Sequence, residues 1–290
     1  MDKINEIINR VFRTNEGYKY ILNLISKRYP TLKINEENLK KIDIEKMDLE
    51  YHLKTSFFGE YVAERNTIKI YFGDKNEKIS DMEIIETFTH ELIHLLTSTY
   101  DKDGTLLQGF NMRDKEKGDS FFIGINEGIT QMMTEEVLDI TNSTAYPFHT
   151  NIARKLSIII GEEELIQAYS KHDIDAFVAK LFEIDNNLDV RSFIIKSYFL
   201  HLVTMGYDIS DAIGLGTEIE DLLNNLYINS KKENDEEYFK LLIDQNDVDV
   251  MAKHVPDKIM SSSRFLYYGI IKDKDKIKNI IKRRRQNGRK

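Results

Sequence analysis

The sequence of 290 residues contains no cysteine and no run of about 20 apolar residues. Without cysteine the chain has no disulfide bonds, and any metal site must use nitrogen and oxygen ligands in place of thiolates. Without a long apolar run we expect no membrane-spanning helix. Residues Met1 to Phe12 follow an amphipathic helical pattern and lack the apolar core of a signal peptide, so we expect a cytoplasmic protein.

The charge of the chain is acidic overall, at −8, and it is unevenly distributed. Residues 271–290 hold ten Lys or Arg against Asp273 and Asp275, so this tail carries +8 and the remainder −16. A basic run such as Lys282 to Arg285 can bind nucleic acid or an anionic surface. A solvated or frayed helical end, which can also dock on the acidic body, is the more common outcome, so we do not expect nucleic acid to be the main partner.

Hydrophobic residues make up 41% of the sequence, enough for a full core in one large or two modest lobes. We expect an α+β fold that is mainly helical. Residues 1–145 are predicted to form a mixed lobe, and residues 146–290 a helical lobe that includes the basic tail. Apolar residues recur at helical spacing in five segments after Thr150, at 152–160, 162–169, 174–184, 190–205 and 211–226.

The amino-terminal part combines helices with a short hairpin. Residues 1–29 predict one long or two short helices, broken near Gly17 and ended by Tyr29 and Pro30. Residues 67–72 alternate apolar and polar side chains, as a half-buried strand does. Residues 60–63 are expected to pair with this strand as a hairpin. The charged segment before residue 56 is ambiguous.

Residues 90–94 read His-Glu-Leu-Ile-His, and they say most about function. On an α-helix, histidines four residues apart lie on one face, where both can bind one divalent metal ion. A helix is predicted independently, because Ser80 and Glu83 form a capping-box pattern and an apolar stripe at helical spacing follows. Taken alone, the motif also fits two exposed surface histidines.

A second motif, Asn126 followed by Glu127, is predicted to open another helix with Asn126 as its N-cap. Glu127 would then lie in the first turn, where the helix dipole favours a carboxylate without any functional reason. Two histidines and one carboxylate are nevertheless a typical ligand set of catalytic zinc, which leaves a fourth position open.

Together the two motifs resemble the gluzincin zinc metallopeptidases, in which an HExxH helix supplies two ligands and a later helix beginning Asn-Glu supplies the third. The resemblance covers roughly residues 60–150. It implies a zincin-like amino-terminal lobe with a small sheet and an active-site helix, one Zn²⁺ per chain, and a peptide or protein substrate. By this resemblance His90, His94 and Glu127 match the metal ligands, and Glu91 matches the catalytic base.

Two other positions bear on the resemblance. Thr97 and Tyr100 stand where a metzincin would have a glycine and a third histidine, so that branch is excluded. Well-known gluzincins have an acidic residue four positions after the carboxylate ligand, where this chain has Gln131. The Gln131 amide oxygen can accept from an imidazole, as a weaker acceptor than a carboxylate. The candidates for a replacement carboxylate are Asp119, Glu135 and Glu136.

The resemblance implies peptide hydrolysis by a metal-activated water, with Glu91 taking the water proton and passing it to the leaving amine. A second electrophile would stabilise the oxyanion, and Tyr146 and His149 are the candidates. Both also fit a structural role, since Tyr146 and Pro147 resemble a turn before the next helix. His172 and His201 are interpreted as packing or surface residues.

In the peptidases that this chain resembles, the strand before the active-site helix lies at the cleft edge. We therefore expect residues 67–72 to pair with an extended substrate. An ordinary sheet strand fits the same pattern. The alternative function is a non-enzymatic binding or regulatory protein on a zincin-like scaffold, with the basic tail contacting nucleic acid.

Overall fold

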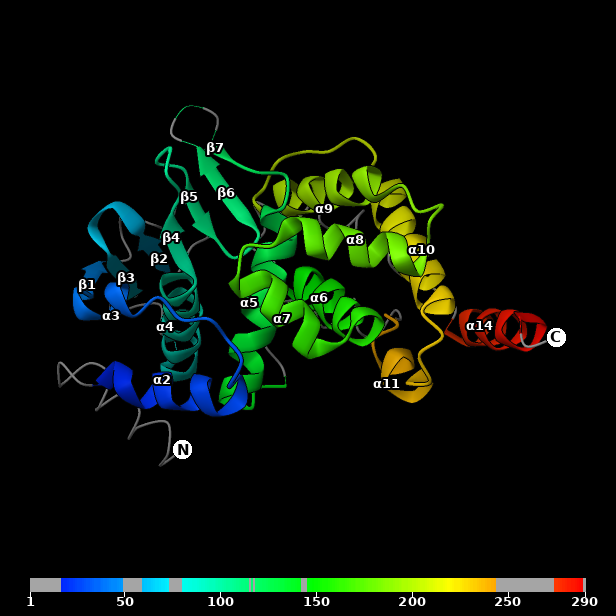
Figure 1. Cartoon of the computed structure of the whole chain (residues 1–290), viewed down its shortest axis with the longest axis horizontal. Coiled ribbons are helices and arrows are strands. Elements are labelled where there is room, and N and C mark those ends of the chain that lie inside the picture. Colours follow the sequence, from blue (N-terminus) through cyan, green and yellow to red (C-terminus); the bar gives the residue numbers. More distant parts are fainter. Residues whose placement is uncertain are drawn as a thin grey trace. The chain divides into compact units, whose positions relative to one another are not determined.

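A computed structural model describes residues 17–48, 59–72, 80–114, 116, 118–141, 145–243 and 274–288. Over these residues the chain is a mixed α+β protein, mainly helical with two small sheets (Figure 1), which confirms the coarse fold class. The chain divides into two compact units. The first unit comprises 1–118, 130–142 and 170–172, and the second comprises 119–129, 143–169 and 173–290. The helical pattern predicted for residues 1–16 lies outside the described residues.

The first sheet has three strands in the order β1-β3-β2. Strand β2 (Gly59–Val62) pairs antiparallel with β3 (Thr67–Phe72), which confirms the hairpin, and Asn66 completes its turn with a positive φ of 52°. Strand β1 (Asp43–Asp48) pairs parallel with β3. Because β3 lies between two strands, the expectation that it offers an edge to substrate is wrong. Its second partner comes from the charged segment whose sequence pattern was ambiguous.

Helix α4 (Asp81–Leu96) follows the sheet and begins as predicted. The Ser80 side chain accepts from the Glu83 backbone N–H, and the Glu83 carboxylate accepts from the Ser80 N–H. These bonds satisfy N–H groups that have no partner within the helix. The predicted apolar stripe is buried, at Ile85, Phe88, Leu92 and Leu96. Burial of this stripe fixes the rotation of α4 about its own axis, and with it the direction of the side chains on the other face of the helix.

Two short helices precede the first sheet, and a second sheet follows α4. Helix α2 (Gly17–Arg28) ends before Tyr29 and Pro30, as predicted, and α3 is Glu36–Lys40. The second sheet has the order β4-β5-β6-β7, and its strands are β4 (Ser98–Tyr100), β5 (Leu106–Gln108), β6 (Asn111–Asp114) and β7 (Gly118–Asp119). It leads the chain into helix α5 (Ile123–Leu138).

The second unit is built from helices, and all five predicted segments after Thr150 are confirmed. They correspond to α6 (Pro147–Ile160), α7 (Glu162–Ser170), α8 (Ile174–Ile184), α9 (Val190–Thr204) and α10 (Ala212–Asn229). Asp173, Asp189 and Asp211 cap α8, α9 and α10 by accepting a backbone N–H three residues on. Two further helices are α11 (Asp235–Lys240) and α14 (Lys274–Gly288).

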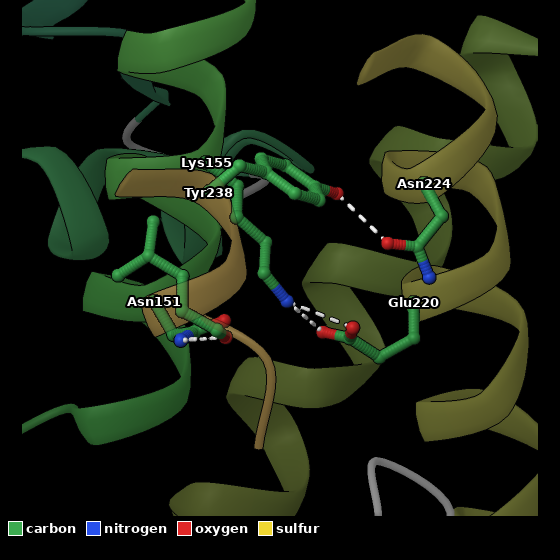
Figure 2. Close-up of polar contacts among 6 residues, drawn as sticks. Asn151, Lys155, Glu220, Asn224 and Tyr238 are labelled. Atoms are coloured by element: carbon green, nitrogen blue, oxygen red, sulfur yellow. Dashed lines mark hydrogen bonds and ion pairs between the residues drawn. The ribbon is translucent and has the colours of Figure 1, made fainter. Parts of the chain in front are cut away.

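A buried polar network lies in the core of the second unit (Figure 2). Lys155 on α6 donates to both carboxylate oxygens of Glu220 on α10, at 2.6 and 2.8 Å. The Tyr238 hydroxyl of α11 donates to Asn224 Oδ1 at 2.9 Å, and the Tyr238 ring stacks on Tyr227 at 3.8 Å. These contacts join three helices around one ion pair.

None of the helices in the described part of the chain combines the length and the apolar character needed to cross a membrane.

Candidate metal centre

Helix α4 places His90 and His94 on one face and buries both side chains, with 6% and 4% of their surface exposed. Their Nε2 atoms lie 3.0 Å apart. Burial removes the interpretation of the pair as exposed surface histidines. The two nitrogens point at a common position, as the four-residue spacing predicted.

Glu127 meets these histidines from helix α5. One ligand atom from each of His90, His94 and Glu127 lies within 4.8 Å of the others, and all three residues are buried. Helix α5 begins at Ile123 and not after Asn126, so the predicted N-cap is wrong and Glu127 is the fifth residue of the helix. The helix dipole acts mainly in the first turn, so it no longer accounts for this carboxylate.

The donor set and its spacing fit a metal ion. Two nitrogens bound at about 2.0–2.1 Å to a tetrahedral ion lie roughly 3.3 Å apart, close to the 3.0 Å between the two Nε2 atoms. A buried carboxylate beside two imidazoles is costly without a compensating cation or hydrogen bonds. The His90, His94 and Glu127 group could therefore hold a metal ion.

Gln131 lies one turn after Glu127 and contacts the centre directly. Its Oε1 accepts from His90 Nδ1 at 2.9 Å. Its Nε2 donates to Glu86 Oε1 at 2.5 Å and to Glu135 Oε1 at 3.4 Å. The amide thus occupies the position of the acidic residue in the gluzincin pattern, with two buried carboxylates behind it. Because this contact fixes α5 to α4, helix continuity brings Glu127 to the histidine pair.

The predicted replacement carboxylates have separate contacts. Glu135 bonds Gln131, whereas Glu136 accepts from Arg28 and from the Tyr29 hydroxyl. Asp119 acts electrostatically on His201. Sequence reasoning missed Glu86, although a signal existed, because it lies four residues before His90 on the same face of α4.

Tyr146 and His149 lie in the second unit with Glu127. Their rings meet edge to face at 5.4 Å, and Tyr146 caps α6 with a positive φ of 47°, a conformation that costs free energy for a non-glycine residue. His149 is buried, and within the described part of the chain neither of its ring nitrogens has a hydrogen-bond partner. Burial and, to a smaller extent, the nearby His201 lower the pKa of His149 to about 3, with Glu127 opposing both effects.

The structure also places His201 in this group, which sequence reasoning had interpreted as a packing residue. The His201 ring lies 5.5 Å from His149 and stacks with Tyr146 at 6.4 Å. Burial lowers the pKa of His201, against the effect of Glu127 and Asp119. A single histidine within a helical pattern carried no signal for this position. His172 instead bonds the Gly109 carbonyl at 2.9 Å, which fits a packing role.

Comparison of the chain with protein-family models, curated proteins and solved structures gave no significant match.

Proposed function

We propose that the chain is a zinc-dependent peptidase of gluzincin type. The observation that carries the proposal is the convergence of His90, His94 and Glu127 ligand atoms within 4.8 Å, from two helices, beside the glutamate of an HExxH motif. Nitrogen and oxygen ligands without thiolates, with three protein ligands, are typical of catalytic zinc. When bound, zinc would supply Lewis acidity that polarises a carbonyl and makes water acidic near neutral pH.

Glu91 is the proposed general base, and it follows the ligand His90 on α4. A Cβ atom at Gly59 would lie 3.4 Å from Glu91 Cγ and 2.5 Å from Thr87 Cγ2. The glycine therefore lets strand β2 lie against this turn of α4. Since β2 is an end strand of the described sheet and the one that lies beside Glu91, its backbone is the proposed pairing edge for an extended peptide, in place of β3.

Tyr146 and His149 are the proposed oxyanion donors. The low pKa keeps the His149 imidazole neutral at physiological pH, so one ring nitrogen carries a proton that it can donate. A buried N–H group without a partner costs free energy that a substrate oxygen would recover. The strained backbone of Tyr146 supports the same assignment, since strain of this kind clusters at functional sites.

The proposal is tested by metal analysis of the chain purified without chelators. We expect about one equivalent of zinc, and hydrolysis of unstructured peptides that chelation abolishes and added zinc restores. Elemental analysis gives the stoichiometry, and a fluorogenic peptide mixture gives the activity. Zinc-free protein that hydrolyses peptides equally well with and without a chelator would overturn the assignment.

A second candidate is a non-enzymatic protein that binds nucleic acid through α14. Ile281 of α14 is buried, whereas Lys276, Lys282, Arg283 and Arg284 are exposed, so the helix is docked and still presents cations. Such binding would weaken steeply with salt, because each phosphate contact releases counterions. Tight binding of duplex DNA that falls with salt, by zinc-free protein, would favour this candidate.

A further inference from the structure

Two polar rows face each other at the candidate metal centre, each with four-residue spacing. They are Glu86, His90 and His94 on α4, and Glu127, Gln131 and Glu135 on α5. The metal group takes His90 and His94 from the first row and Glu127 from the second. Gln131 is the central residue of the second row, and 1% of its surface is exposed.

The direction of the hydrogen bonds along this contact follows from Glu86. A carboxylate can only accept, so the group that faces Glu86 Oε1 at 2.5 Å must be the Gln131 amide nitrogen. The amide oxygen then faces His90, which must donate from Nδ1 across 2.9 Å. The proton of neutral His90 therefore sits on Nδ1, and the Nε2 lone pair is directed at the metal position.

Only a carboxamide satisfies both sides of this contact. A carboxylate at position 131 would be a stronger acceptor for His90, but it would set an oxygen against Glu86 with no hydrogen between them. A purely apolar side chain would leave the His90 N–H and the Glu86 carboxylate without this partner. A glutamine at this position therefore suits the buried Glu86 and Glu135 carboxylates, because its amide nitrogen donates to both.

We propose that Gln131 is the positioning residue of the metal centre, and that Glu86, assisted by Glu135, sets the His90 tautomer through it. The proposal rests on the metal site of the proposed function and does not require peptide hydrolysis. It reverses the usual expectation for this position, because an acidic residue should here weaken metal binding.

The test is a double-mutant cycle on the full chain, read by zinc affinity in competition with a chromophoric chelator. Gln131→Glu is expected to lower the affinity by about 10- to 100-fold, the usual effect of losing such a partner. Glu86→Gln combined with Gln131→Glu exchanges acceptor and donor, and is expected to restore the affinity to within about threefold of wild type. Recovery of this kind would not follow from a merely structural role.

Further variants keep the test decisive. Gln131→Met removes the acceptor without adding charge, and it should also weaken zinc binding. This variant serves as the test if Gln131→Glu fails to fold. Glu136→Gln is the matched control, because it changes a neighbouring glutamate that pairs with Arg28 and Tyr29, and it should leave zinc affinity unchanged. Nitrogen-15 chemical shifts of His90 should report the Nδ1–H tautomer in wild type and its loss in Gln131→Met.

Each outcome decides the proposal. Zinc affinity that stays equal or rises in Gln131→Glu, or that the double exchange does not recover, overturns it. A wild-type chain that binds zinc but cleaves no peptide overturns the peptidase assignment alone. A wild-type chain that binds no zinc overturns both.

Discussion

Lys155 and Glu220 (Figure 2) are buried as deeply as His90, His94 and Glu127. The two groups differ in what they contact. In the second unit the Lys155 ammonium donates to both oxygens of Glu220, so the positive and the negative charge neutralise each other. Burial lowers the pKa of Lys155, and Glu220 opposes that effect. The ion pair itself is complete without a ligand, although in the described part of the chain the neighbouring Asn224 Nδ2 has no hydrogen-bond partner.

The candidate metal centre is not complete in the same sense. Two imidazole Nε2 atoms lie 3.0 Å apart beside a buried carboxylate, and in the described part of the chain His149 has no hydrogen-bond partner for either ring nitrogen. A buried polar group that serves packing has its partners within the protein. The difference supports the proposal that the ion pair of the second unit stabilises the fold, whereas the His90, His94 and Glu127 group receives an ion and a substrate.

The largest expected effect is on catalysis, at Glu91. Replacement by glutamine keeps the shape but removes the base, so turnover should fall by about 10²- to 10⁴-fold. Zinc content should stay at wild-type level, because Glu91 is not one of the proposed ligands. Peptide hydrolysis and elemental analysis measure the two quantities. Glu64→Gln, on the exposed turn of the hairpin, is the control and should change neither. Retention of full turnover in Glu91→Gln would rule out this base.

The next effect is on stability, at the ion pair of the second unit. Lys155→Met leaves the Glu220 carboxylate buried without its cation and should lower the free energy of unfolding by about 3–5 kcal/mol. The double variant Lys155→Met with Glu220→Leu should recover most of that loss. Lys180→Met breaks an exposed pair with Glu183 and should cost less than about 1 kcal/mol. Urea unfolding measures the free energy of unfolding of all three variants. A small loss in Lys155→Met would contradict the role of this ion pair in stabilising the fold.

A smaller stability effect is expected at Glu127, and only with metal present. Excess zinc at 100 times its Kd should raise the free energy of unfolding of the wild type by about 2.7 kcal/mol. Glu127→Ala should lose most of this gain, together with the bound zinc. The metal-free variant should be about as stable as the metal-free wild type, unlike Lys155→Met. A large destabilisation of metal-free Glu127→Ala would show that Glu127 serves the fold as Lys155 does.

The last effect is a pH dependence that appears only in acid, from His149 in the metal-free chain. Its pKa is about 3 when folded, below the value of about 6.5 expected when unfolded, so the unfolded state binds the proton first. This contribution to stability is present above pH 6.5 and is lost as the pH falls towards 3, by at most about 1.4 kcal/mol per pH unit. Unfolding of His149→Gln should show a shallower acid slope than wild type. Identical slopes would contradict burial of a neutral His149.

Local structure was predictable because it depends on neighbours in the sequence. The Ser80 capping box, the buried stripe of α4 and the five helices after Thr150 all follow from propensities and from the 3.6-residue period. The alternation in residues 67–72 likewise predicted a strand. Its partner β1 was not predictable, because the segment 43–48 is rich in charge and pairs in parallel across a long stretch of chain.

The sequence by itself determined that His90 and His94 share a helix face, since that requires only the geometry of one helix. Tertiary structure decided the rest of the site. The start of α5 at Ile123 moved Glu127 out of the first turn, and packing of α5 on α4 joined Gln131 to Glu86 and His90. Contacts of this kind join residues more than 40 positions apart in the sequence. The periodicity of a helix specifies which of its faces is buried, but not which other helix packs against that face.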